Sequence, residues 1–152
     1  MLLNLLIGTP VMLLCLIIEA VFVIISLRLF VHLRPDQARV SLNSSILPLA
    51  LVMLVMLLGN FLQTAIWALL FLLLGEFDDF QTALYFSGVT FATLGYGDLV
   101  LSPQWRLQSA LTSGSGILMF GVSTAVMTAA VMDVMKRHVA WLKTQAGDGQ
   151  RR

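Results

Sequence analysis

The segment from Thr93 to Asp98 reads Thr-Leu-Gly-Tyr-Gly-Asp and lies between long apolar stretches. Its two glycines, Gly95 and Gly97, permit backbone angles that direct successive carbonyl oxygens to one side of the chain. A row of carbonyl oxygens can replace the hydration shell of a cation. These residue types and their spacing therefore predict irregular, extended backbone that coordinates a dehydrated cation.

The composition indicates that this segment works inside a membrane. Of the 152 residues, 59% are hydrophobic and only 11% are charged, and the mean hydropathy is +0.92. A soluble domain of this length could not bury so much apolar surface. The net charge of +1 gives no indication of a nucleic-acid partner, and the single cysteine, Cys15, provides no disulfide framework. The sequence also contains no P-loop, metal-binding motif or paired nucleophile and base, so we expect no enzymatic activity.

Three apolar stretches are long enough to cross about 30 Å of hydrocarbon. They run from about Leu2 to Val31, from Ile46 to Leu74 and from Leu107 to Met135. A fourth stretch, Phe80 to Ala92, makes only about three turns, which is typical of a re-entrant helix. Asp78 or Asp79 would cap its first turn. Its negative C-terminal end would stabilise a cation in the membrane interior, just before the Thr93–Asp98 segment. Irregular backbone is tolerated there only where it lines a water-filled path.

The basic residues predict the orientation in the membrane. Of the nine Lys and Arg residues, all except Arg106 fall on one side of a three-span arrangement. These are Arg28, Arg34, Arg39, Lys136, Arg137, Lys143, Arg151 and Arg152. Because cytoplasmic loops carry an excess of Lys and Arg, we expect the N-terminus outside and the C-terminus in the cytoplasm. The compact architecture favours a multi-pass protein of a prokaryotic cell (inner) membrane.

In this setting, Thr93–Asp98 resembles the signature of the potassium channel pore-domain family, Thr-[Val/Ile/Leu]-Gly-Tyr-Gly-Asp. The resemblance covers about Ile46 to Lys136 and leaves the first span outside it. It implies an all-α integral membrane protein with three transmembrane helices, a re-entrant pore helix and a selectivity filter, assembled as a homotetramer. The implied divisions are an extra N-terminal helix (1–33), a cytoplasmic loop (34–45), the pore domain (46–136) and a short basic cytoplasmic tail (137–152), which we expect to be loose.

The resemblance also implies roles for individual filter residues. The backbone carbonyls of Thr93, Leu94, Gly95 and Tyr96 resemble the stacked ligands of the potassium ion, and the Thr93 hydroxyl resembles the innermost ligand. Gly97 and Asp98 would support the filter, with Asp98 at the outer mouth. The implied partners are potassium as the permeant ion, further copies of the chain and membrane lipid.

The surroundings of the motif depart from the pattern of many relatives. Val89 stands where some relatives carry a Glu that engages the Asp of the motif, and Tyr85 and Phe86 stand where some carry a pair of Trp residues. Neither Val89 nor Phe86 can bond Asp98. We therefore hypothesise that the Tyr85 hydroxyl is the remaining local donor to Asp98.

Polar and small residues within the spans leave alternatives open. Aligning Arg106 with the arginine that often starts this helix in the family needs a one-residue deletion, and Gly116 then falls at the position of the family's hinge glycine. Gly116 is therefore either a gating hinge or a site of close helix packing. Glu19 lies in the middle of the first span, where an ionisable side chain is costly. We expect it to be hydrogen-bonded by Asn60 or Gln63; a gating or proton-sensing role is the alternative. We expect Asn60, Gln63 and Thr64 to bond between helices.

The sequence thus predicts a channel that conducts potassium passively. The alternatives are a weakly selective cation channel and a non-conducting or accessory subunit with the same fold. No span carries Arg at every third position, so no voltage sensor is expected.

Overall fold

The computed structural model describes residues 2–33 and 42–149, and within them every regular element is a helix. The helices are α1 (Leu2–His32), α2 (Leu42–Leu73), α3 (Phe80–Phe91) and α4 (Arg106–Gly149). Among the described residues, three stretches are long and apolar enough to cross a membrane: Leu2–His32, Ser45–Leu73 and Arg106–Lys143. The predicted all-α fold is therefore confirmed. Of the expected loop at 34–45, residues 34–41 lie outside the described residues, and the remainder forms the start of α2.

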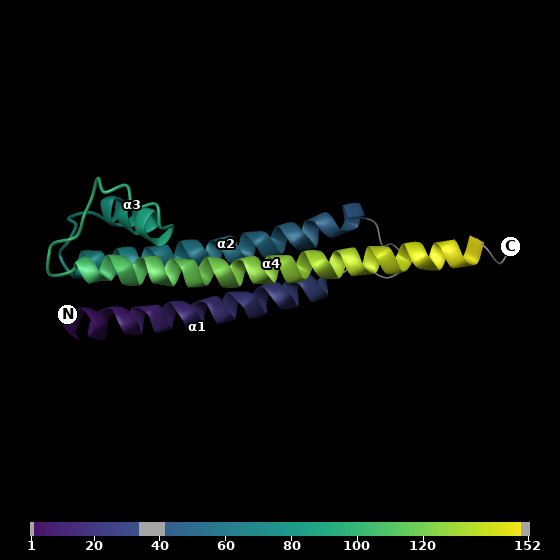
Figure 1. The fold of residues 1–152 in the computed structure, drawn as a ribbon, viewed down its shortest axis with the longest axis horizontal. Helices are drawn as coiled ribbons and strands as arrows, with labels where there is room; N and C mark the ends of the chain where they lie inside the picture. The colour runs from purple at the N-terminus through teal and green to yellow at the C-terminus, as the bar shows by residue number, and fades with distance from the viewer. Residues whose placement is uncertain (1, 34–41, 150–152) are drawn as a thin grey trace.

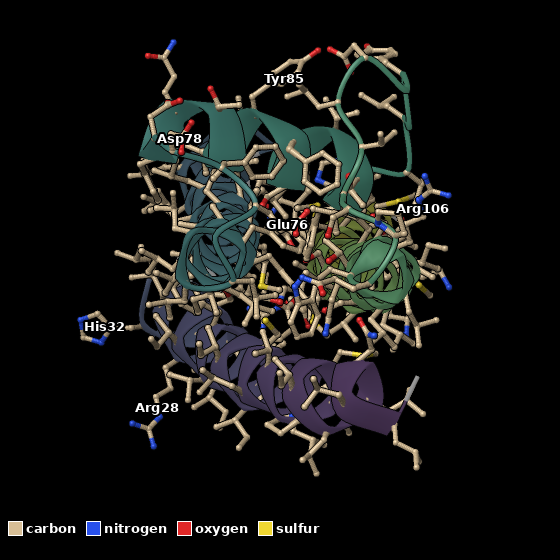
Figure 2. All side chains as sticks on the ribbon, turned by 90° about the vertical axis from the view of Figure 1, so that its left-hand side faces the viewer. Arg28, His32, Glu76, Asp78, Tyr85 and Arg106 are labelled. Carbon is tan, nitrogen blue, oxygen red and sulfur yellow. The ribbon has the colours of Figure 1, made fainter. Side chains whose placement is uncertain are left out.

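The three long helices lie side by side, and α3 packs at one end of them (Figure 1). Viewed along the helices, α2 and α4 form a central pair, with α3 on one face and α1 on the opposite face (Figure 2). The N-terminus of α1 lies at the same end as α3, whereas α4 projects from the other end (Figure 1). The first helix is thus a further layer on the α2–α4 pair.

An aromatic cluster holds α3 against the long helices. Trp67 and Phe71 of α2 pack with Phe86 and Phe91 of α3 and with Met119 of α4, and all five side chains are buried. The rings of Phe71 and Phe86 pack edge to face, with centroids 5.2 Å apart and planes inclined by 78°, an arrangement that aromatic pairs favour. This packing places the end of α3 at a defined position beside α4.

A polar cluster crosses the middle of the bundle and links α1, α2 and α4. The Glu19 carboxylate accepts hydrogen bonds from Gln63 Nε2 at 2.7 Å and from the Ser123 hydroxyl at 3.0 Å. Ser123 Oγ accepts in turn from Asn60 Nδ2 at 3.1 Å. We call Glu19, Asn60, Gln63 and Ser123 the Glu19 cluster. The predicted bond from Gln63 to Glu19 and the interhelical role of Asn60 are confirmed.

The prediction of an interhelical bond for Thr64 is wrong. Its hydroxyl donates to the Asn60 carbonyl, four residues earlier in α2, at 2.9 Å. A threonine hydroxyl in a helix lies within reach of that carbonyl, and this local bond competes with partners on other helices.

The C-terminal part of α4 also differs from the prediction. We expected the span to end near Met135 and a loose tail to follow, but the helix continues to Gly149. Arg137 Nε lies 2.8 Å from Asp133 Oδ2, one turn earlier. The rings of His138 and Trp141 stack with their centroids 5.9 Å apart. Pairs at these spacings stabilise a helix in water, so the polar tail prolongs α4.

Candidate functional site

The short helix α3 carries the Thr93–Asp98 segment. It begins after Asp79, one of the two predicted caps, whose carboxylate accepts a hydrogen bond from the Thr82 backbone N–H at 2.8 Å. This bond stabilises the ionised carboxylate and holds the pKa of Asp79 below its ordinary value. At the other end, Thr90 and Phe91 are buried beside α4. The segment therefore starts from a well-anchored helix end.

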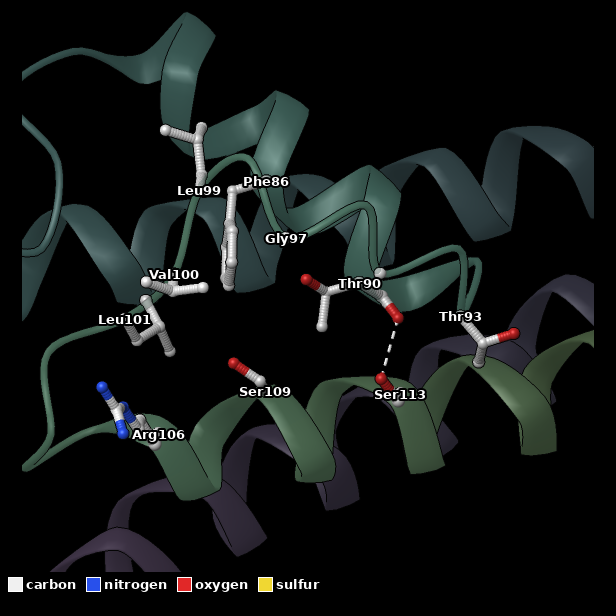
Figure 3. Close-up of a pocket in the computed structure, with 11 residues that line it drawn as sticks. Phe86, Thr90, Thr93, Gly97, Leu99, Val100, Leu101, Arg106, Ser109 and Ser113 are labelled. Atoms are coloured by element: carbon white, nitrogen blue, oxygen red, sulfur yellow. Dashed lines mark hydrogen bonds between the residues drawn. The ribbon is translucent and has the colours of Figure 1, made fainter.

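The last carbonyls of α3, which have no partner inside the helix, bind the chain that follows. The backbone N–H groups of Thr93 and Leu94 donate to the carbonyls of Thr90 and Val89, at 3.0 and 2.9 Å. The Ser113 hydroxyl on α4 donates to the same Thr90 carbonyl at 2.9 Å (Figure 3). The start of the segment is thus tied to both α3 and α4.

The backbone of the segment alternates in handedness. The angle φ is +59° at Thr93, +55° at Gly95 and +77° at Gly97, whereas Leu94 and Tyr96 between them have no positive φ. In an ordinary strand, successive residues face opposite sides. Reversing φ at every second residue turns alternate peptides over, so that their carbonyls share one side. Thr93 is β-branched, and a positive φ there costs on the order of 1–3 kcal/mol, which the glycines avoid.

The carbonyl oxygens of Thr93, Leu94, Gly95 and Tyr96 accept no hydrogen bond from any part of the chain that the structure describes. The Leu94 and Tyr96 side chains are 56% and 66% exposed. Backbone acceptors in a membrane interior need a partner. The four carbonyl oxygens are therefore available to a ligand. The Leu94 and Tyr96 side chains are not packed by the rest of their own chain.

Tyr85 and Asp98 form the hydrogen bond that the sequence suggested. The Tyr85 hydroxyl donates to Asp98 Oδ2 at 2.7 Å. The bond lowers the pKa of Asp98, because it stabilises the carboxylate, and raises the pKa of Tyr85, because ionisation would remove the donor. It joins α3 to the end of the segment and fixes that end from outside the row of carbonyls.

Glu76, which the sequence did not single out, holds the chain that leaves the segment. Its two carboxylate oxygens accept hydrogen bonds from the Ser102 backbone N–H at 2.7 Å and the Ser102 hydroxyl at 2.6 Å. Leu101, next to Ser102, is only 2% exposed. No local pattern marks this pair, because the two residues lie 26 positions apart. In the sequence, the position of Glu76 just after the second span was the only feature that could have pointed to this role.

Gly116 lies against the end of α3. A Cβ atom at this position would collide with the carbonyl oxygen of Phe91, while α4 runs through it as continuous helix. The structure therefore supports the close-packing interpretation of Gly116. Its use as a gating hinge stays a prediction.

A cavity of about 430 Å³ separates the segment from the first turns of α4. Thr90, Thr93 and Phe86 line one side, and Ser109 and Ser113 line the other (Figure 3). The segment is therefore bound at its two ends but is not backed by its own chain along its length.

A sequence profile of a family described as ion channel matches residues 52–133, more than half of the chain. The chain belongs to this ion channel family. The matched region contains α3, the Thr93–Asp98 segment and most of the two helices that flank them, and it leaves α1 outside. The protein is thus a pore-domain channel with an additional N-terminal helix. No curated protein and no solved structure matches the sequence.

Proposed function

We propose that this ion channel is potassium-selective and that Thr93–Asp98, hereafter the filter segment, is its selectivity filter. The observation that carries the proposal is the alternation of φ at Thr93, Gly95 and Gly97 together with the free carbonyls of this stretch. The Thr-Leu-Gly-Tyr-Gly-Asp signature supports the same assignment.

Conduction would proceed by exchange of ligands. A potassium ion sheds water as the carbonyls of Thr93, Leu94, Gly95 and Tyr96 take its place, and the Thr93 hydroxyl serves as the innermost ligand. The negative end of α3 lowers the energy of the cation at the inner entrance. The Tyr85–Asp98 bond and Gly97 keep the outer end of the row in place.

One chain supplies only one side of such a pore, so we propose a homotetramer. The exposed Leu94 and Tyr96 side chains and the cavity beside the filter segment are surfaces that neighbouring copies would cover. The positive-inside rule places the N-terminus and the filter segment outside and the C-terminus in the cytoplasm of a cell (inner) membrane, with lipid around α1.

The test is ion flux into liposomes that contain the purified full chain, comparing potassium, rubidium and sodium. Gly95→Ala should abolish selective flux, since the new side chain disfavours φ of +55°. Gly114→Ala is the matched control, because Gly114 has ordinary helical φ and open space at its Cβ position. Equal potassium and sodium flux in the wild type would make the protein a weakly selective cation channel. Absence of flux would favour a non-conducting subunit.

A further inference from the structure

The part of α4 beyond Gly121, which we call its lower half, meets α1 at a buried hydrogen bond from Ser123 and in an apolar cluster of Phe30 with Ala130 and Val134. Above Gly121, α4 is anchored to α3 by the bond from Ser113 to Thr90 and by the contact of Gly116 with Phe91. Just beyond Gly121, Ser123 donates to the Glu19 carboxylate of α1. Gly121 itself has no atom within 4 Å of its Cβ position, so the glycine between the two anchoring sites is unobstructed.

The Glu19 contact is buried and carries no countercharge. Glu19 is 2% exposed, Ser123 3% and Gln63 0%. No other charged or titratable side chain of the Asp, Glu, Lys, Arg or His type lies on the stretches of helix around it. These stretches are residues 2–27 of α1, the whole of α2 and residues 107–132 of α4. The carboxylate is therefore stabilised by neutral donors alone. Such a group is costly in a membrane, and losing one donor leaves an oxygen unpaired where water cannot replace it.

The three donors are arranged in a directed chain. Asn60 of α2 donates to Ser123, and Ser123 donates to one oxygen of Glu19, while Gln63 of α2 donates to the other oxygen. Both oxygens of the carboxylate are used, and they join α2 and α4 to α1. A displacement of Ser123 would break its bonds with both Glu19 and Asn60 together.

From this geometry we infer that Glu19 is a positioning residue for α4, which holds the lower half of the pore-lining helix through Ser123 and so sets the equilibrium between conformations of the channel. The inference rests on the proposed function, in which α4 lines the pore. It gives α1, which lies outside the matched family region, a role in gating.

The experiment is a double-mutant cycle on the full chain in planar bilayers. Glu19→Gln retains the side-chain volume but offers one acceptor in place of two, and Ser123→Ala removes the donor from α4. Each change should alter the open probability by about threefold or more in the same direction. The two effects should be clearly less than multiplicative in the double variant, since both changes act on the Glu19–Ser123 bond, while Ser123→Ala also removes the acceptor of Asn60.

A matched control separates this role from general weakening of the α1 interface. Ser26 is also buried on α1, and its hydroxyl contacts Met56 Sδ of α2 at 3.2 Å. Ser26→Ala should lower thermal stability slightly and leave the open probability unchanged. Effects of Glu19→Gln and Ser123→Ala that multiply in the double variant, or an equal gating shift in Ser26→Ala, would overturn the inference.

A readout without ion flux keeps this test distinct from the test of conduction. Spin labels on cysteines at Val31 of α1 and Met135 of α4, both more than half exposed, would be placed in a Cys15→Ala background and diluted with unlabelled chains. Glu19→Gln should shift or broaden the Val31–Met135 distance distribution, whether or not the wild type conducts. An unchanged distribution would overturn the inference, and a shifted one in a non-conducting protein would overturn only the proposed function.

Discussion

The filter segment and the Glu19 cluster both place polar oxygens inside a membrane protein, but they treat hydrogen bonding in opposite ways. In the filter segment, four backbone carbonyls have no donor within the described chain, and Thr93 adopts a positive φ. In the Glu19 cluster, both carboxylate oxygens accept hydrogen bonds and the side chain is buried. Free acceptors therefore indicate a site for a ligand, whereas satisfied ones indicate a connection between helices.

The largest expected effect concerns the support beneath the filter segment. Gly116→Ala would force α4 away from the Phe91 carbonyl, and overpacking of this kind costs about 1–3 kcal/mol, occasionally more. We expect a clear loss of thermal stability in detergent together with loss of selective flux. Gly121→Ala, which meets open space, serves as the control. Equal stability of the two variants would show that α4 and α3 are not tightly packed at this point.

The next effect concerns the Glu19 cluster. Glu19→Met leaves the Gln63 amide and the Ser123 hydroxyl without their acceptor, and unpaired buried donors cost about 1–3 kcal/mol. Thermal unfolding should report this loss, while the potassium-to-sodium flux ratio remains that of the wild type. Replacing all four cluster residues by apolar ones should recover much of the stability. A changed flux ratio in Glu19→Met would mean that the cluster acts on the filter segment itself.

A smaller effect of opposite sign is expected at Thr93. Thr93→Gly relieves the strain of φ at +59°, worth on the order of 1–3 kcal/mol, but adds roughly 0.5–1 kcal/mol of backbone entropy cost. We expect a net gain of about 1 kcal/mol in the free energy of unfolding. The variant also lacks the hydroxyl of the proposed innermost ligand, so potassium selectivity should fall. A loss of stability would indicate that ions or neighbouring chains favour the threonine conformation.

The smallest effect concerns Tyr85 and shows itself in pH dependence. The Tyr85–Asp98 hydrogen bond contributes fully to the stability of the filter segment at pH values above 3.8, the ordinary pKa of an Asp side chain. This contribution is lost as the pH falls through the lowered pKa of Asp98. On the alkaline side it contributes fully below 10.0 and is lost as pH rises through the raised pKa of Tyr85. Tyr85→Phe should therefore inactivate faster than the wild type at intermediate pH. The difference should close in strong acid, and identical decay of flux at neutral pH would argue against any role of this bond.

Local features of the sequence were sufficient to predict the irregular backbone of Thr93–Asp98 and most of the fold. The lengths of the apolar stretches, the Asp79 cap and the glycine spacing each depend on neighbouring residues. Except at the C-terminal end of α4, the helices begin and end close to the predicted positions. The Tyr85–Asp98 bond was within reach because only 13 residues separate the pair. For all of these, the chain itself restricts the geometry.

Long-range pairs could be predicted only in part. Gln63 was one of two candidate donors to Glu19, but the Ser123 partner depends on the rotation of α4 about its axis, which no periodicity in so apolar a helix determines. The Glu76–Ser102 bonds and the contact of Gly116 with Phe91 likewise depend on how separate elements dock. The C-terminal part of α4 was missed for another reason: a polar composition is compatible with a solvated helix as well as with a loose tail.

The separation of the Glu19 partners along the chain also gives the biosynthesis of this channel an order. Gln63 and Ser123 follow Glu19 by 44 and 104 residues, so α1 leaves the ribosome well before either donor has been made. During that interval the carboxyl group has no partner from α2 or α4. Newly made α1 is therefore poorly suited to rest alone in lipid until α2 arrives, and chains that stop before α4 would retain a half-satisfied Glu19 by which a membrane quality-control protease could distinguish them.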